Sequence, residues 1–478
     1  MAQERPILIS SVEPAPALDS LAVLENLAVR SVSDSTLATL FQEGSAYWLR
    51  GSDELTLAGL GAVATIASEG PHRFNDSDAA WAAIADGALV DDQSDLAVGT
   101  GRMLMGGFAF DPEGPRSDAW TGFPSGHLIV PRILLTSVDG QTWITMSALI
   151  GPDADLDAEV RTLTTLRDSA IAASDIEDSD SALNAFTPDV EFQDEPEAAA
   201  WRKSVVATVD AIQSGSLEKV VLARATRADA PKDIDAYATL RSLRSTNRNA
   251  FVFGYWRGTN AFVGASPERL IRLDGRNVQA SSLAGTARRG TNDAEDAEAI
   301  AELFASAKDR VEHAVVVRAL KEVLGEFCDD VTAPSAPSLL TLPNVHHLET
   351  EVRGQLRPGN TVLKIISLLH PTPAVGGSPR DEALQFIRDI EKIDRGWYAG
   401  PVGWIGREGG EFAVALRSAI LYGSEAMLYA GCGIVAESDP DLEYTESVLK
   451  LQPMKSAIAA AVAATSSAST TVVAADHA

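Results

Sequence analysis

Two pairs of acidic residues, each with a three-residue spacing, are the strongest signs of chemistry in this sequence. Asp309 and Glu312 form one pair, and Glu443 and Glu446 form the other, with Lys450 one helical turn after Glu446. Side chains three or four positions apart share one face of a helix, so each pair presents two carboxylates together. Taken alone, such a pair is more often solvated helix surface than a site.

The residues that follow these pairs weaken the surface interpretation. HAVVV follows Glu312 and SVLKL follows Glu446, so both segments enter apolar surroundings. Unpaired carboxylates near a core are costly unless a cation compensates them. Mg²⁺ is a natural solution, because it binds one or two carboxylates together with water and an oxyanion substrate.

A lysine and a glutamate provide a candidate base and a candidate acid. Lys219 opens the apolar stretch KVVL, where desolvation would lower its pKa and make it a usable base near neutral pH. Glu268 lies in GASPERL, a predicted strand-to-loop turn, where a raised pKa would suit an acid. The plainer alternatives are an exposed lysine at a strand start and a glutamate paired with Arg269 or Arg272.

The predicted elements place these residues on helices and at strand ends. Residues 1–190 have the pattern of mixed strands and helices, and the acidic, Ser-rich stretch 170–197 predicts a solvated connector. Later helices are predicted over 196–213, 292–327 with Thr291 or Asn292 as the N-cap, and 442–455. Later strands are predicted over 219–224, 397–405, 412–422 and 426–434.

Composition excludes several classes of partner. The 478 residues carry a net charge of -28, which disfavours nucleic acid and anionic membrane surfaces. An anionic substrate would therefore need a local cluster of cations, a metal, or both. With two cysteines, no CxxC pair, no signal-peptide pattern and no run of 18 or more apolar residues, the sequence predicts a cytoplasmic protein.

Nine short blocks taken together resemble the chorismate-utilising enzymes, which include isochorismate, salicylate, anthranilate and aminodeoxychorismate synthases. In order, the blocks are LEKVVLAR (217–224), FVGASPERL (262–270), LAGTARRG (283–290), KDRVEHAVVV (308–317), LHPTPAVGGSP (369–379), YAGPVGW (398–404), ALRSAI (415–420), AGCGIVAESDP (430–440) and EYTESVLK (443–450). The blocks follow the family's order within the stretch from about 195 to 455, about 260 residues, so the agreement is too specific to be due to chance.

The resemblance implies a fold and a division of the chain. The expected fold is α/β (α+β), similar to anthranilate synthase component I. It is a single large unit of two intertwined subdomains, with mainly antiparallel sheets flanked by helices. Residues 1–190 would be the variable N-terminal half, 195–455 the chorismate-binding catalytic region, and 456–478 a partly disordered tail. The family also suggests a monomer.

The resemblance also implies a metal site. Glu312 and Glu446 match the residues that hold Mg²⁺, with Asp309 and Glu443 as companions. Where this chain has Asp309, the family more often has Glu. The ion would bind the ring carboxylate of chorismate, assisted by Lys450 and by backbone amides around Gly431 and Gly433.

The remaining implied contacts position the substrate. Arg417 and Tyr398 match residues that grip the enolpyruvyl carboxylate, a task for which an arginine fork is well shaped. His347 matches a substrate-pocket histidine. Ala374 and Val375 would line the pocket beside the ring, whereas His370 is expected to be structural.

The implied reaction is that of an isochorismate synthase. Lys219 matches the base that activates water for attack at C2, and Glu268 matches the acid that protonates the departing C4 hydroxyl. Ala284 stands where aminodeoxychorismate synthases carry a lysine nucleophile, which argues against that activity. A salicylate synthase, an aminating component with a glutaminase partner, and an inactive scaffold remain alternatives. The pathway, menaquinone or catechol siderophore synthesis, is left open.

Overall fold

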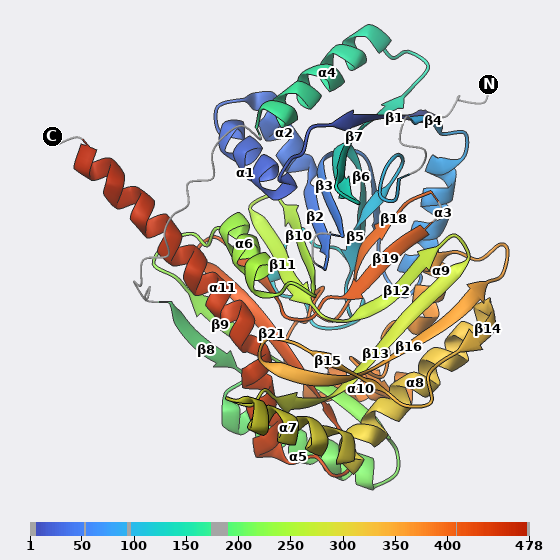
Figure 1. Ribbon diagram of the computed structural model, residues 1–478, viewed down its shortest axis with the longest axis vertical. Coiled ribbons are helices and arrows are strands. Elements are labelled where there is room, and N and C mark those ends of the chain that lie inside the picture. The colour runs from blue at the N-terminus through green and yellow to red at the C-terminus, as the bar shows by residue number, and fades with distance from the viewer. Residues whose placement is uncertain (1–5, 52–53, 93–96, 174–189, 408, 476–478) are drawn as a thin grey trace.

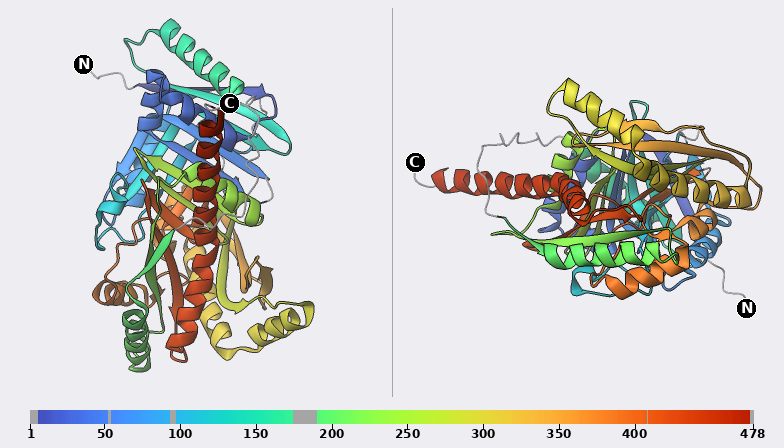
Figure 2. Two further views of the ribbon diagram at one scale, coloured as in Figure 1. Left: turned by 90° about the vertical axis from the view of Figure 1, so that its left-hand side faces the viewer. Right: turned by 90° about the horizontal axis from the view of Figure 1, so that it is seen from below.

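The computed structural model describes residues 6–51, 54–92, 97–173, 190–407 and 409–475. Within these ranges, 21 strands form one connected hydrogen-bonded sheet system. Helices flank it above and below, and α11 (Pro440–Ala475) runs along the length of the molecule (Figures 1 and 2). The arrangement confirms the predicted mixed fold with mainly antiparallel sheets.

Two runs of strands diverge from β6 (Gly126–Val138). The first passes through β3 (Leu55–Ser68), β2 (Ser45–Arg50), β10 (Phe251–Arg257), β11 (Asn260–Ser266), β20 (Ser418–Tyr422), β21 (Glu425–Ile434) and β9 (Lys219–Asp229). The second passes through β5 (Leu104–Phe108), β18 (Pro401–Ile405), β19 (Gly409–Val414), β12 (Arg269–Asp274), β13 (Asn277–Arg288) and β16 (Val345–Leu356).

This topology intertwines the two halves of the chain. The N-terminal strands β2 and β5 pair with the C-terminal strands β10 and β18, so neither half completes its sheet alone. The first run ends with β9, which begins at Lys219, and the second passes through β12, which begins one residue after Glu268. The predicted base therefore lies on one run of strands, and the predicted acid lies just before a strand of the other. The proposed residue limits of the halves stay a prediction.

The remaining strands complete the edges. They are β1 (Ile7–Ala15), β4 (Leu89–Asp92), β7 (Gln141–Ile150), β8 (Glu191–Glu195), β14 (Cys328–Thr332), β15 (Ser338–Thr341) and β17 (Gly377–Ser378). The other helices are α1 (Ser20–Ser31), α2 (Ser35–Glu43), α3 (Arg73–Ala85), α4 (Leu156–Ala172), α5 (Ala198–Gln213), α6 (Ala236–Thr246), α7 (Asp293–Ala305), α8 (Ala307–Phe327), α9 (Val362–Leu369) and α10 (Arg380–Ile390).

Four predicted elements differ from the structure, the simplest being the strand expected over 397–405, which begins only at Pro401. The helix expected over 292–327 is two helices, because Ser306 adopts an extended backbone and its hydroxyl accepts the Asp309 N–H, which starts α8 anew. The strand expected over 412–422 is broken between β19 and β20, where Arg417 has a φ of 50°. The helix expected to end at residue 455 continues to Ala475, and Ala457, Ile458 and Val462 are buried.

Other sequence expectations agree with the structure or fall outside it. Helix α5 occupies the stretch predicted as helical after residue 196, and Asn292 caps α7 by accepting the N–H groups of Ala294 and Glu295. Most of the predicted connector, residues 174–189, lies outside the described residues. No helix in the described part of the chain is long and apolar enough to cross a membrane.

Candidate active site

A cavity of about 60 Å³ lies between β9 and β21 of the first run and β13 and β16 of the second. Its lining includes ten of the residues that the sequence singled out, namely Glu268, Glu312, His347, Ala374, Val375, Tyr398, Arg417, Gly431, Gly433 and Lys450. Four others, Lys219, Asp309, Glu443 and Glu446, do not line it. Lys219, Asp309 and Glu446 lie next to the lining residues Glu312, Gly285 and Lys450, respectively, and Glu443 lies beside Glu446.

The predicted base reaches the cavity only through a carboxylate. Lys219 is fully buried at the start of β9, and its Nζ lies 3.0 Å from Oε1 of Glu312 on α8. Gly433 makes this approach possible, because a Cβ at that position would lie 2.2 Å from the same oxygen. The Lys219–Glu312 ion pair must therefore open before the amine can accept a proton from water in the cavity.

Glu268 is a buried carboxyl held by its backbone. Its side chain is 3% exposed, its N–H donates to the Ser266 hydroxyl, and its carbonyl accepts the Val414 N–H. Burial raises its pKa to about 8, against the opposing charges of Lys219 and Lys450. The group is therefore mostly protonated at neutral pH, which is the state that an acid requires.

The expected alternative for Glu268, a salt bridge to a neighbouring arginine, does not form. Arg269 instead pairs with the buried Glu411 at 3.0 Å, and Arg272 pairs with Asp274 at 3.3 Å. Because alternate residues of a strand point to opposite faces, Arg269 at the first position of β12 is directed away from its predecessor.

Arg417 and His347 form a rigid pair at the cavity wall. Nδ1 of His347 lies 3.1 Å from the Gly285 carbonyl oxygen, so Nδ1 carries the proton and donates it there. Nε2 is then the acceptor for Arg417 Nη2 at 3.3 Å. Burial, and next the charge of Arg417, lower the pKa of His347 to about 3, so the imidazole is neutral. Burial lowers the pKa of Arg417 to about 10, which leaves it cationic at neutral pH.

Lys450 is a second cation at the wall. Its Nζ lies 2.7 Å from Oε1 of Glu446 and donates to the Gly431 carbonyl oxygen at 2.9 Å. Burial acts to lower the pKa of Lys450, but Glu446 outweighs it and raises the pKa above the usual value. The Gly431 carbonyl thus holds Lys450 in place, and the expected contact of backbone amides around Gly431 and Gly433 with the ring carboxylate stays a prediction.

The carboxylates of Glu443 and Glu446 on α11 lie close to each other and to the Cys432 thiol. Ligand atoms of Glu443, Glu446 and Cys432 all lie within 4.8 Å of one another. Glu443 is buried, and its Oε1 accepts a hydrogen bond from Ser438 at 2.7 Å. Carboxylate oxygens suit a hard ion such as Mg²⁺, whereas a thiol does not, so the donor set fits Mg²⁺ through Glu443 and Glu446.

The other metal candidates lie on α8. Glu312 lines the cavity and Asp309 lies beside it, where a Cβ at Gly285 would be 3.2 Å from Oδ1 of Asp309. Glu312 is not part of the α11 cluster, because its Oε1 is directed toward Lys219. To bind one ion together with α11, Glu312 would use its second carboxylate oxygen or release Lys219.

Aromatic and small residues close the cavity. Tyr398 stacks on Tyr429 with ring centroids 5.1 Å apart, and burial raises the Tyr398 pKa to about 12, so its hydroxyl keeps its proton. Gly431 leaves room for that hydroxyl, which would lie 3.0 Å from a Cβ at this position. Ala374 and Val375 contribute a small apolar wall.

Sequence reasoning missed Arg395, which lines the cavity as a structural cation. It is 5% exposed and pairs with Glu391 in the same segment after α10, with 2.5 Å between Nη2 and Oε1. Arg395 also donates to the carbonyls of Val375 and Val221, which belong to two walls of the cavity. The four-residue spacing between Glu391 and Arg395 was the only signal, and it does not distinguish a buried pair from an exposed one.

Replacing Arg395 with alanine is expected to destabilise the protein strongly. The change leaves Glu391 buried without its cation, which typically costs about 3–5 kcal/mol of unfolding free energy. Urea denaturation followed by circular dichroism measures the loss. Arg353→Ala, which breaks an exposed pair with Glu351, is the control and is expected to change little. Equal midpoints for the two variants would contradict this role of Arg395.

Comparison with known proteins agrees with the site. Residues 1–459 match the family described as chorismate binding enzyme. An isochorismate synthase of Bacillus subtilis is 35% identical over 417 residues, covering 86% of this chain and 87% of the relative. The structure of the menaquinone-specific isochorismate synthase from Escherichia coli superposes with a TM-score of 0.75 at 26% identity, covering 96% of each chain.

A more distant structure supports the fold alone. Anthranilate synthase component I from Streptococcus pneumoniae superposes with a TM-score of 0.62 at 22% identity, covering 76% of this chain and 82% of the other. The predicted resemblance to that fold is confirmed.

Proposed function

Because this chain belongs to the chorismate binding enzyme family, we propose that it is an isochorismate synthase that converts chorismate to isochorismate. The observation that carries the proposal is the cavity in which a buried, protonated Glu268 shares its walls with Glu312, the partner of Lys219, and with two cations. An acid, a base and anion-binding groups are the three functions that this isomerisation requires.

In the proposed reaction a hydroxyl group is lost at one ring carbon and gained at another. Lys219 removes a proton from water as the water oxygen forms a bond to C2 of the ring. The two ring double bonds shift, and the bond from C4 to its hydroxyl group breaks. Glu268 donates a proton to this hydroxyl group, which leaves as water. Glu268 ends ionised and Lys219 ends protonated, so a proton must return from the amine to the carboxylate through solvent.

The substrate carries two carboxylates, and the cavity offers cations for them. Arg417 is held by His347 in one orientation, which suits it to bind the enolpyruvyl carboxylate together with the Tyr398 hydroxyl. Lys450 would bind the ring carboxylate from the wall of the cavity. When bound by Glu312, Glu446, Glu443 and Asp309, Mg²⁺ would neutralise that carboxylate and fix its position.

Identification of the product tests the proposal directly. Purified protein is incubated with chorismate, with and without Mg²⁺, and the products are separated by chromatography. Isochorismate formed only with Mg²⁺ is expected. Salicylate and pyruvate as the main products would indicate a salicylate synthase, ammonia-dependent anthranilate an aminating enzyme, and unchanged chorismate an inactive scaffold.

Glu446→Ala is expected to remove the response to Mg²⁺. Loss of one carboxylate should raise the Mg²⁺ concentration for half-maximal activity by at least about 10-fold, since even outer contacts of a metal site contribute 10- to 100-fold in affinity. Calorimetric titration with Mg²⁺ gives the same affinity without turnover. Glu437→Ala, an exposed carboxylate just before α11, is the matched control. An unchanged Mg²⁺ dependence for Glu446→Ala would exclude Glu446 as a ligand.

A further inference from the structure

A second cavity, of about 290 Å³, adjoins the catalytic one. The two cavities share Pro267 and Arg417 in their walls. The rest of the lining comes from three parts of the chain. Residues 245–250 are the end of α6 and the loop that follows it, residues 341–344 are the end of β15 and the turn to β16, and Ala265 and Arg289 complete the walls. We call this space the vestibule.

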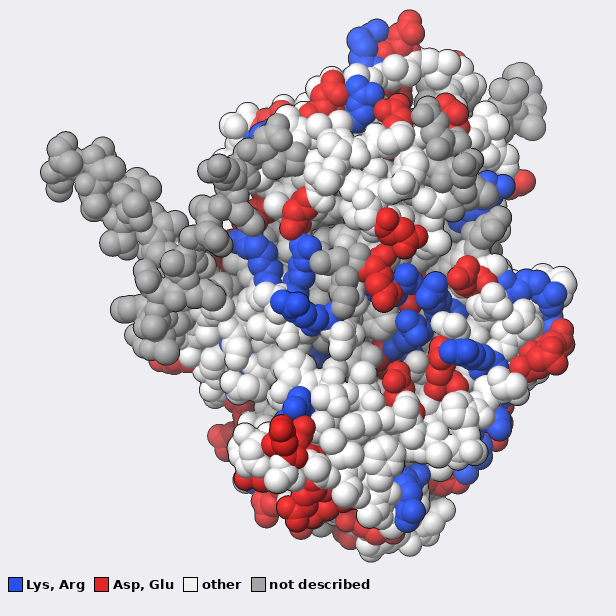
Figure 3. Space-filling model, in the orientation of Figure 1, with Lys and Arg blue, Asp and Glu red and all other residues white. Residues whose placement is uncertain are grey.

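The vestibule is cationic in a strongly acidic protein. Its described lining contains Arg248, Arg289 and Arg417 and no Asp or Glu, although the chain carries a net charge of -28. The charge of Arg289 is offset by its ion pair with Asp296, so Arg248 and Arg417 supply the positive charge of this space. Figure 3 shows Lys and Arg side chains gathered over α6, which leads into the loop 247–250, whereas Asp and Glu gather over α7. A concave surface of one sign focuses the field and attracts ions of the opposite sign.

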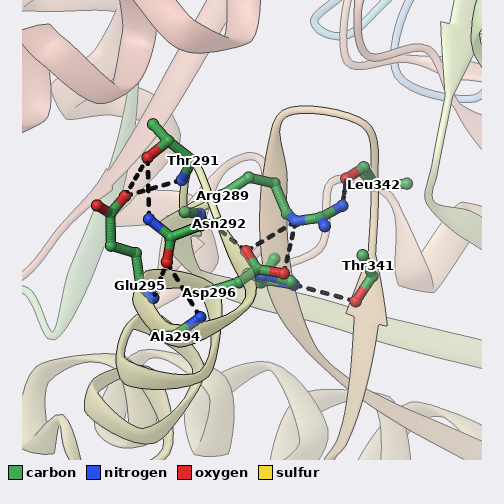
Figure 4. A network of polar contacts seen from close by, with 10 residues as sticks. Arg289, Thr291, Asn292, Ala294, Glu295, Asp296, Thr341 and Leu342 are labelled. Atoms are coloured by element: carbon green, nitrogen blue, oxygen red, sulfur yellow. Dashed lines mark hydrogen bonds and ion pairs between the residues drawn. The ribbon is translucent and has the colours of Figure 1, made fainter.

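A polar network holds one wall of the vestibule in place (Figure 4). Arg289 donates through Nε to both carboxylate oxygens of Asp296, at 2.9 and 3.0 Å, and through Nη1 to the Leu342 carbonyl at 3.4 Å. His346 bridges the same carboxylate, at 2.9 Å, to Thr341, at 3.0 Å. The turn 341–344 is therefore fixed to the start of α7.

The same wall is hydrogen-bonded to α11, the helix that carries Glu443, Glu446 and Lys450. The Asn344 side chain donates to the Leu449 carbonyl at 2.9 Å, and Leu449 precedes Lys450 on α11. The opposite wall is more exposed, since Ser245, Thr246, Arg248 and Asn249 face solvent. The side-chain hydrogen bonds of Ser245, Thr246 and Asn247 are local and run to carbonyls within α6.

The position of Arg417 connects the two spaces. It is 8% exposed, lines both cavities and holds a positive φ between β19 and β20. The catalytic cavity is small and enclosed by strands, whereas the vestibule is several times larger and bordered by an exposed loop.

From these observations we propose that the vestibule is the access route to the catalytic cavity and a transient binding site for the carboxylates of chorismate, with Arg248 at its mouth and Arg417 at its inner end. The inference rests on the proposed function for the identity of the anion. An acidic enzyme thereby gains a local positive path for a dianionic substrate.

Charge reversal at the mouth tests the route. Arg248→Glu is compared with Arg161→Glu, which makes the same change in net charge on exposed α4. Stopped-flow fluorescence with chorismate and Mg²⁺ resolves the binding phase before turnover. The association rate constant is expected to fall by about 3-fold or more at low salt for Arg248→Glu only, and the difference should shrink as salt screens the charge.

A steric plug provides an independent test. Asn249→Trp places a bulky side chain on the exposed loop of the vestibule. Association and dissociation are both expected to slow by a similar factor with the dissociation constant unchanged, because an obstacle on a path alters both directions equally. Equal association rates for Arg248→Glu and Arg161→Glu, or unaltered rates for Asn249→Trp, would overturn the proposal. If the unmodified protein fails to bind or convert chorismate, the proposed function fails instead.

Discussion

Lys219→Ala is expected to lower the turnover number with chorismate by at least about 100-fold, because a positioned general base typically contributes 10²- to 10⁴-fold. Lys219 does not line the cavity, so substrate binding should change little. Steady-state kinetics gives the turnover number, and calorimetric titration with chorismate and Mg²⁺ gives the dissociation constant. Near-normal turnover would show that Lys219 is not the base.

Lys219→Arg separates the base from the ion pair. An arginine can keep the contact with Glu312 that Lys219 makes at 3.0 Å, but its guanidinium does not release its proton at neutral pH. The variant is therefore expected to fold like the unmodified protein and to be as inactive as Lys219→Ala. Activity retained by Lys219→Arg would mean that the lysine serves only as a cation. Lys203→Ala, on the exposed side of α5, controls for loss of charge.

Glu268→Gln is expected to lower the turnover number by about 10²- to 10⁴-fold, since an amide cannot donate the proton that the departing hydroxyl requires. The substitution keeps the size of the side chain, and the backbone contacts to Ser266 and Val414 do not involve it. Chorismate binding, measured by calorimetry, is therefore expected to persist. Turnover within about 10-fold of normal would exclude Glu268 as the acid.

The pH profile identifies the same group independently. The folded-state pKa of Glu268 is raised to about 8, so the active, protonated form prevails below pH 8 and is lost above it. We expect kcat/KM of the unmodified protein to fall as pH rises through about 8, and this limb to be absent in Glu268→Gln. An identical limb in both proteins would assign the titration to another residue.

The raised pKa of Glu268 should also make the free energy of unfolding depend on pH. Between the unfolded pKa of 4.5 and the folded pKa of about 8, Glu268 is protonated in the folded protein and ionised in the unfolded one. The unfolded state then binds fewer protons, so this group makes the unfolding free energy decrease as pH rises through that window. Glu268→Gln removes this dependence, and urea denaturation at pH 5 and pH 8 would show the smaller difference.

The sequence by itself determined which chemical groups are present and which of them share an element. The three-residue spacings of Asp309 with Glu312 and of Glu443 with Glu446 are realised on α8 and α11, because helical geometry brings such positions to one face. Lys219 begins a buried strand, as its apolar successors predicted. The nine blocks further identified the family and the fold.

The hydrophobic pattern did not reveal where one element ends and the next begins. The broken helix at Ser306 and the kink at Arg417 lie inside stretches whose periodicity looked continuous. The reason is that a capping hydroxyl or a single positive φ changes the chain direction without altering the hydrophobic pattern around it.

Only the tertiary structure decided which groups meet. Lys219 forms an ion pair with Glu312. Arg269 forms one with Glu411 and not with Glu268. Arg395 forms a buried pair with Glu391. Such pairings depend on the register of strands far apart in sequence and on the desolvation that their packing imposes. Spacing along one chain segment reports neither, so the raised pKa of Glu268 and the cationic vestibule beside it appear only once the sheet is assembled.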